Sequence, residues 1–320
     1  MHPQRRKEAT LSHVQALIDA IGLGAVYALI AVGIGLVFGV LRIVNFAYGQ
    51  LIMIAAYMLV FTQGWGDAGA ILIAVAAAVF ASLVMERVTF RPLRTTSPAT
   101  VLVATFAISY LLQNVALLRY TYQNRPVGDS VGVLGGLNRA AEIGSLHVRW
   151  ITFVAIGAGV VSLVALALLL NRTSIGLQMR AAAADFHTAR LLGVKANTVI
   201  MAAVAVSGVL AAVSAVILTI QSPQVTNTTG LNETIFVLVG VVVGGMNRLL
   251  SATLGGFAIG FANSFLGFEL ATQGSNSGTA VPFTSSVYLP SVIYVLVILV
   301  LLFRPAGLFA RHGQAAVERV

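Results

Sequence analysis

Long uncharged apolar runs constrain the fold of this chain most strongly. Only 9% of its 320 residues are charged and 58% are hydrophobic, whereas a typical soluble domain carries about 25% charged residues. A run of about 18 apolar residues is long enough to cross a membrane as a helix. The runs that reach this length are residues 20–41, 43–66, 68–85, 95–118, 150–171 and 196–232. They lack the two-residue alternation of a membrane barrel, so the sequence predicts an all-α, polytopic membrane helical bundle.

We expect one domain over residues 1–320, with about eight transmembrane helices, some of them broken or half-length, between residues 17 and 303. Glycines divide one late hydrophobic segment into two pieces, which we count as a pair. The predicted spans are residues 17–40, 43–63, 68–85, 97–118, 150–170, 197–220, 234–246, 249–268 and 286–303.

The charge distribution predicts how the bundle is oriented. The net charge is +9, but the basic residues are spread over short segments between spans, which fits membrane topology better than nucleic-acid binding. Basic residues are concentrated in residues 86–94, 172–195 and 304–320, so we expect these segments, including a tail over 304–320, to be cytoplasmic. Counting crossings back from residues 86–94 puts the N-terminus outside. We favour a translocated basic tail over an early segment that does not cross.

The stretch RIVNFAYGQL, residues 42–51, interrupts the apolar sequence with polar groups. In a continuous helix, Asn45 and Gln50 would be buried polar groups that each cost about 1–3 kcal/mol when unpaired. A broken helix avoids this cost, because Gly49 can adopt unusual backbone angles and the freed backbone groups can line a polar path. The alternative is an ordinary tight turn in which Arg42 reaches the lipid headgroups.

A second interruption lies in the other half of the chain, where Gly244 and Gly245 separate two apolar pieces. Paired interruptions in the two halves of a transporter indicate a central site. The alternative is close helix packing, because Gly256-x-x-x-Gly260 and Gly35-x-x-x-Gly39 have the spacing of small residues at helix contacts. Both interpretations can hold together.

Residues 173–193 are predicted to form a short amphipathic helix on the cytoplasmic side. Ser174 can cap its start, a run of alanines favours helix, and Gly193 suits the left-handed residue that ends one. Leu177, Ala184 and Leu191 fall on one face. An alanine-rich face suits docking to a protein better than anchoring in lipid, although a helix lying on anionic lipid is the alternative.

Several functions are disfavoured by what the sequence lacks. The carboxylates fall at span ends or in loops, whereas proton- or sodium-coupled carriers generally need an ionisable group inside the bundle. No Gly-Lys-Ser/Thr occurs, so the chain cannot bind ATP through a phosphate loop. The histidines have no metal-ligand spacing, and there is no cysteine. We expect no metal, no cofactor and no enzymatic activity, and we expect any motor to be another polypeptide.

Three segments together resemble the permeases of bacterial branched-chain amino acid ABC importers. They are YALIAVGIGLVFGVLRIVNFAYGQLIMIAAY, SIGLQMRAAAADFHTARLLGV and VVVGGMNRLLSATLGGFAIG, and the similarity runs in order over most of residues 17–308 to the closing LFRPAGLF. The family usually has histidine where this chain has Tyr48. It often has acidic residues where this chain has Gln50, and small residues where it has Arg248. These departures bear on the substrate more than on the fold.

The resemblance implies an inner-membrane permease that imports small amino acids, most simply leucine, isoleucine and valine. Its partners would be cytoplasmic ATP-binding subunits, a second permease, a periplasmic binding protein and membrane lipid; a related chain is favoured as the second permease. The residues expected to shape the translocation path are Asn45, Gly49, Gly244 and Gly245. The residues expected to contact the ATPase are Arg180, Ala184, Asp185, Leu191, Leu192 and Gly193.

Two alternatives stay open at this stage. Related systems carry urea or short amides, so such a substrate is the close alternative. A secondary carrier or channel that works alone is the rival of a different class, and a membrane enzyme would need a reactive constellation that the sequence does not offer.

Overall fold

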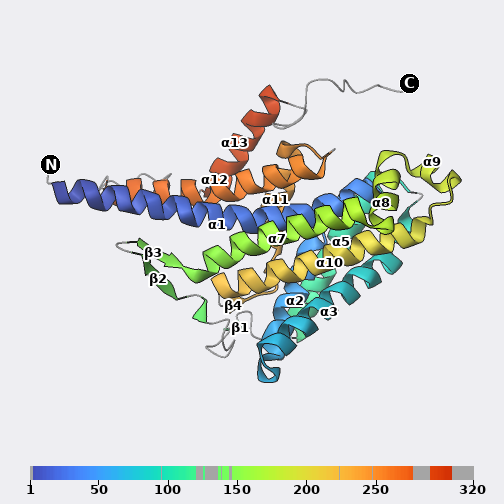
Figure 1. The fold of residues 1–320 in the computed structure, drawn as a ribbon, viewed down its shortest axis with the longest axis horizontal. Coiled ribbons are helices and arrows are strands. Elements are labelled where there is room, and N and C mark those ends of the chain that lie inside the picture. Colours follow the sequence, from blue (N-terminus) through green and yellow to red (C-terminus); the bar gives the residue numbers. More distant parts are fainter. Residues whose placement is uncertain are drawn as a thin grey trace.

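The computed structural model describes residues 3–94, 96–119, 125–126, 136–137, 139–143, 146–222, 224–246, 248–276 and 289–304. Over these residues the chain forms a bundle of long helices with a few short strands (Figure 1). Of the predicted tail over 304–320, all but Arg304 lies outside the described residues.

The helices of 14 residues or more correspond one to one to the predicted spans. They are α1 (Pro3–Leu41), α2 (Tyr48–Phe61), α3 (Asp67–Met85), α5 (Pro98–Arg119), α7 (Trp150–Arg172), α10 (Ala196–Gln221), α11 (Leu231–Gly244), α12 (Leu249–Asn276) and α13 (Leu289–Phe303). However, α1 begins 14 residues before its predicted start, α2 begins five residues after its own, and α12 runs eight residues past its predicted end. Within the described residues, six of these are long and apolar enough to cross a membrane, and α2, α11 and α13 are shorter apolar helices. The prediction of an all-helical polytopic membrane bundle with half-length segments is confirmed.

The remaining elements are short and lie between the long helices. They are η1 (Gln63–Trp65), η2 (Glu86–Phe90), α4 (Arg91–Leu93), α8 (Ser174–Ala184), α9 (Phe186–Leu191) and the strands β1 (Arg125–Pro126), β2 (Ala140–Ile143), β3 (Leu146–Arg149) and β4 (Gln224–Val225). β2 and β3 form an antiparallel hairpin, and β1 pairs with β4. These strands were not expected from the sequence, because each is only two to four residues long.

α1 is the central element of the bundle. It packs along α12 and also against α10 and α7. A Cβ atom on Gly256 would lie 2.5 Å from the Cβ of Ala31, and one on Gly260 would lie 2.8 Å from the Cβ of Tyr27. Contacts this close require small residues, because a side chain would force the two backbones apart. The predicted role of Gly256-x-x-x-Gly260 in helix packing is therefore confirmed.

The two glycines of the other small-residue motif, Gly35-x-x-x-Gly39, differ in their surroundings. A Cβ on Gly35 would lie 3.2 Å from Leu249, so this glycine permits a fairly close contact with α12. A Cβ on Gly39 would meet no atom within 4 Å. The prediction that both glycines of Gly35-x-x-x-Gly39 sit at a helix contact is wrong for Gly39.

The basic segments gather at one end of the bundle. Arg42, just after α1, donates a hydrogen bond to the carbonyl of Ala183 in α8, and Arg94, just after α4, donates one to Asn197 at the start of α10. In Figure 1 this end holds α8 and α9, and the start of α1 lies at the opposite end. Basic residues favour the cytoplasmic side. The end with α8 and α9 is the one that the sequence predicts to be cytoplasmic, and the outside location of the start of α1 stays a prediction.

Candidate functional site

The predicted interruption at residues 42–51 is a true break between α1 and α2. α1 ends at Leu41, and Arg42 takes a left-handed backbone angle, φ 56°, which residues other than glycine rarely adopt. Asn45 is 3% exposed, and its Oδ1 accepts a hydrogen bond from the backbone N–H of Ala47 at 2.9 Å. This turn satisfies both groups locally, so the polar side chain is buried without an unpaired acceptor.

The first turn of α2 carries further buried polar groups. The side chain of Gln50 is fully buried, and its Nε2 donates to Oγ of Ser109 in α5 at 2.9 Å. Within the described residues, Oε1 of Gln50 and the hydroxyl of Tyr48 have no hydrogen-bond partner. Buried polar atoms without partners are uncommon in folded proteins. The start of α2 therefore places polar groups inside an apolar bundle, as the sequence predicts. Ser109 belongs to this polar cluster and was not predicted from the sequence.

The start of α2 touches the start of α11 through two glycines. A Cβ on Gly49 would lie 2.6 Å from the carbonyl oxygen of Gly230, and a Cβ on Gly230 would lie 2.6 Å from the carbonyl oxygen of Gly49. Gly230 also has φ 84°, and its N–H donates to the carboxylate of Glu233 at 3.0 Å. The sequence analysis missed Gly230. The spacing of Gly230 and Glu233, which together cap α11, is the signal that could have found it.

The two short helices run from this junction towards opposite ends of the bundle. α2 leads through η1 into α3, which returns to the end that holds the basic residues 86–94, so α2 ends at the opposite end of the bundle. α11 ends beside the start of α12, where Gly244 meets Ser251. Each has 14 residues, or about 21 Å at 1.5 Å per residue, less than the roughly 30 Å hydrocarbon core. Two helix N-termini therefore meet part-way along the bundle. The N–H of Gly230 there is bound by the carboxylate of Glu233, and the N–H groups of Gln50 and Leu231 donate to turn carbonyls.

The second predicted interruption is also real but differs in character. α11 ends at Gly244, and Gly245 has φ 107° before α12 begins at Leu249. A Cβ on Gly244 would lie 2.2 Å from the carbonyl oxygen of Ser251 and 2.8 Å from the Cα of Gly255. The contacts closest to Gly244 are thus with α12, whereas those closest to Gly49 are with Gly230 and Thr234. The predicted path glycines are therefore not brought together as one pair.

Segment 173–193 is not the single helix that the sequence predicts. Asp185 adopts an extended conformation, φ −150° and ψ 107°, which separates α8 from α9. Its carboxylate accepts hydrogen bonds from the backbone N–H and the hydroxyl of Thr188, at 3.2 and 2.5 Å. Aspartate favours this break because its carboxylate accepts a hydrogen bond from an N–H in the first turn of α9, which has no carbonyl partner within that helix.

The residue that caps the start of this segment differs from the prediction, whereas its end is as predicted. The residue that caps α8 is Thr173, whose hydroxyl accepts from the N–H of Gly176 at 3.0 Å, rather than Ser174. Gly193 has φ 87°, and the N–H of Val194 donates to the carbonyl of Ala189. This is the left-handed glycine termination that the sequence predicts.

All the residues expected to contact an ATPase are exposed at the end of the bundle that holds α8 and α9. Leu191 and Leu192 are 76% and 80% exposed. Met179 and Ala182 point inward and are buried. The exposed set is Arg180, Ala184, Asp185, Leu191, Leu192 and Gly193.

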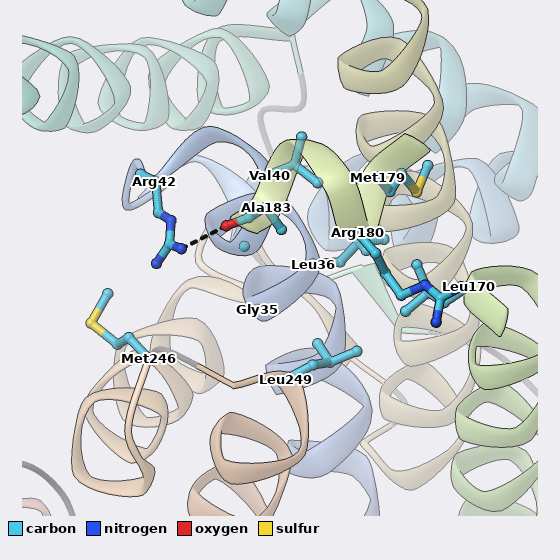
Figure 2. A pocket seen from close by; sticks show the side chains of 11 residues that line it. Gly35, Leu36, Val40, Arg42, Leu170, Met179, Arg180, Ala183, Met246 and Leu249 are labelled. Atoms are coloured by element: carbon cyan, nitrogen blue, oxygen red, sulfur yellow. Dashed lines mark hydrogen bonds between the residues drawn. The ribbon is translucent and has the colours of Figure 1, made fainter. Parts of the chain in front are cut away.

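Figure 2 shows how this segment meets the α1–α2 break. Nη2 of Arg42 donates to the carbonyl oxygen of Ala183, near the end of α8, at 2.7 Å. A cavity of about 160 Å³ lies between α1, α8 and the start of α12, and Leu36, Met179 and Leu249 are among its lining residues. The break and the exposed segment are thus joined by a direct hydrogen bond between Arg42 and Ala183.

Among the described residues, no group of three or more His, Asp or Glu side chains lies close enough together to hold a metal ion. The buried carboxylate of Glu86 pairs with Arg94, which also contacts Asn197. These charges are therefore used in a structural link between η2, α4 and α10.

Comparison with known proteins identifies the family. Residues 16–303 match the family described as branched-chain amino acid transport system, permease component. The chain is 30% identical to the high-affinity branched-chain amino acid transport system permease protein LivH of Escherichia coli K12, over 98% of this chain and 99% of LivH. It is 29% identical to the corresponding protein BraD of Pseudomonas aeruginosa, over 96% of this chain and 98% of BraD.

A more distant relative also matches the chain over most of its length. The probable branched-chain amino acid transport permease protein LivH of Methanocaldococcus jannaschii is 25% identical over 93% of each chain. The family match covers every long helix of the bundle, from the start of the apolar part of α1 to the end of α13. This multi-pass membrane protein therefore belongs to the family of permease components of branched-chain amino acid transport systems.

Proposed function

We propose that this protein forms one half of the membrane path of an ATP-driven importer that carries leucine, isoleucine or valine inward. The observation that carries the proposal is the link between the exposed segment 173–193 and the α1–α2 break through Arg42 and Ala183. The relatives of this chain are named as branched-chain amino acid permeases, which supports this substrate class over urea or short amides.

The proposed ATPase contact is the exposed face of α8 and α9. An exposed pair of leucines at the cytoplasmic end suits a protein cleft, because isolated apolar patches of this kind commonly mark interaction sites. Closure of the ATPase would push α8, and the Arg42 hydrogen bond would pass the motion to the end of α1. The remaining partners are a second permease and a periplasmic binding protein.

The proposed path passes the junction of α2 and α11. Asn45 holds the polar turn that begins α2, and Gly49 allows α11 to approach. Gly244 and Gly245 shape the path indirectly, because they fix α11 against α12. Backbone N–H groups at the start of α2 favour a passing carboxylate.

Reconstitution of the complete transporter in vesicles tests this function. We expect leucine uptake that requires both ATP inside and the loaded binding protein outside. Vesicles with the permease pair alone provide the control. Concentrative uptake by that control would overturn the ATP-driven assignment, and uptake of urea in place of all three amino acids would overturn the substrate class.

A further inference from the structure

A polar cavity on the outer side of the α2–α11 junction has no role in the account above. It has a volume of about 120 Å³ and lies where α10 ends and α11 begins. α10 starts at the cytoplasmic end, beside Arg94, so its last turn lies towards the outside. The residues that line the cavity are Leu218, Thr219, Ser222, Gln224, Thr226, Thr228, Thr229, Asn232 and Glu233.

The lining combines one carboxylate with many neutral oxygen atoms. Among the described lining residues, Glu233 is the only charged side chain. Its carboxylate accepts hydrogen bonds from the N–H of Gly230 and from its own backbone N–H. These bonds hold the carboxylate in place, and a carboxylate with about four acceptor positions retains capacity for another donor.

A second observation indicates that the cavity receives a ligand. Thr219 is 3% exposed and lines the cavity, yet its hydroxyl has no hydrogen-bond partner within the described residues. A buried threonine in a helix can usually donate to a carbonyl of the preceding turn, as Ser214 does in the same helix. A buried hydroxyl without a partner needs an explanation, and a ligand in the adjoining cavity is one.

We propose that this cavity binds the α-ammonium group of the amino acid as it enters the path, with Glu233 as the counter-ion and Thr219 as a hydroxyl ligand. An ammonium group has three donors and no acceptor, which matches a cavity rich in oxygen atoms. The volume is below the roughly 300–1,000 Å³ of sites that enclose a whole ligand, so the apolar side chain would stay outside the cavity. Gly230 connects the cavity to Gly49, and this inference therefore rests on the proposed path.

Methylammonium is the probe for this site, because it carries the same donors without a carboxylate or an apolar side chain. We expect it to inhibit leucine uptake by the reconstituted transporter when the binding protein is saturated with leucine. Equal concentrations of tetramethylammonium, which has no N–H donor, control for ionic strength. Glu233→Gln keeps an oxygen for the Gly230 N–H but removes the charge. It should weaken inhibition by methylammonium and lower the maximal uptake rate, each about tenfold or more, since a hydrogen bond to a charged group is lost.

Two further variants separate binding from folding. Thr219→Val keeps the size of the side chain and the cap of α11, and should weaken methylammonium inhibition about twofold to tenfold. Glu269→Gln alters a carboxylate on α12 that pairs with His13 of α1. This variant should leave the inhibition unchanged. Wild-type inhibition in Glu233→Gln overturns the inference. If that variant fails to assemble, wild-type inhibition in Thr219→Val overturns it instead. Absence of any amino acid uptake by the unmodified transporter would overturn the proposed function, which is a distinguishable result.

Discussion

The two interruptions that the sequence predicts as a matched pair are built in different ways. The break before α2 is polar, since Asn45 and Gln50 are buried there and each makes a hydrogen bond. The break after α11 is close-packed, because Gly244 brings the backbones of α11 and α12 into contact. Buried polar side chains thus indicate a break in a helix, where backbone hydrogen bonds are lost. A glycine pair is a less specific signal, because it also occurs where two helices pack closely.

The largest expected effect concerns the packed break. Gly244→Ala places a methyl group against the carbonyl of Ser251 and the backbone of Gly255, which should cost about 1–3 kcal/mol as overpacking. Gly244→Ser should cost as much, because the overlap is steric and a hydroxyl does not relieve it. The thermal midpoint of the purified protein in detergent measures both.

The matched control for this pair is Gly39→Ala. Since a Cβ at Gly39 meets no atom within 4 Å, the substitution should be neutral or stabilise the protein by about 0.5–1 kcal/mol as glycine leaves a helix interior. An equal loss in Gly39→Ala and Gly244→Ala would remove the distinction between a packed and an open glycine.

The polar break should respond to chemistry rather than to volume. Asn45→Leu removes the acceptor of the buried Ala47 N–H, at a cost of about 1–3 kcal/mol, and should slow uptake per folded transporter. Asn45→Ser should recover part of the loss, because a serine hydroxyl can form the same turn more weakly. Identical uptake rates in wild type and Asn45→Leu would show that the turn is only a connection.

The link from this break to the cytoplasmic segment is tested at Arg42. Arg42→Gly removes the hydrogen bond to Ala183 and suits the positive φ, so backbone strain does not confuse the result. We expect the number of ATP molecules hydrolysed per leucine to rise about twofold to tenfold, as for loss of one hydrogen bond. Radiolabelled uptake and phosphate release, measured together, give this ratio. An unchanged ratio would place the transmission elsewhere.

The smallest effect distinguishes two neighbouring hydroxyls. Thr173→Ala removes the cap of α8 and should destabilise that helix by about 1 kcal/mol. Ser174→Ala should change the stability by no more than about 0.5 kcal/mol, because Ser174 is not the cap. Amide hydrogen exchange in residues 174–184 measures both. Faster exchange in the Ser174 variant would contradict the observed cap.

Much of the fold could be predicted, because a membrane leaves few choices. A run without charge that is long enough to span must be a helix whose backbone groups are paired internally. The break at residues 42–47 was also accessible, since Asn45 and Gln50 are costly in a continuous apolar helix. The segment 173–193 was predicted as one helix, because its alanines favour helix on both sides of Asp185. Only the structure shows that the aspartate instead caps a second helix.

The sequence by itself determined the membrane class, the helical spans and the left-handed glycine at Gly193. These depend on local composition and on the exclusion of charge from lipid. Only the tertiary structure decided that Gly49 meets Gly230 while Gly244 meets Gly255, and that Arg42 reaches Ala183. Such pairings join residues more than ten, and up to 181, positions apart along the chain. They depend on which helix faces pack together, and that is a property of the whole bundle rather than of any single segment.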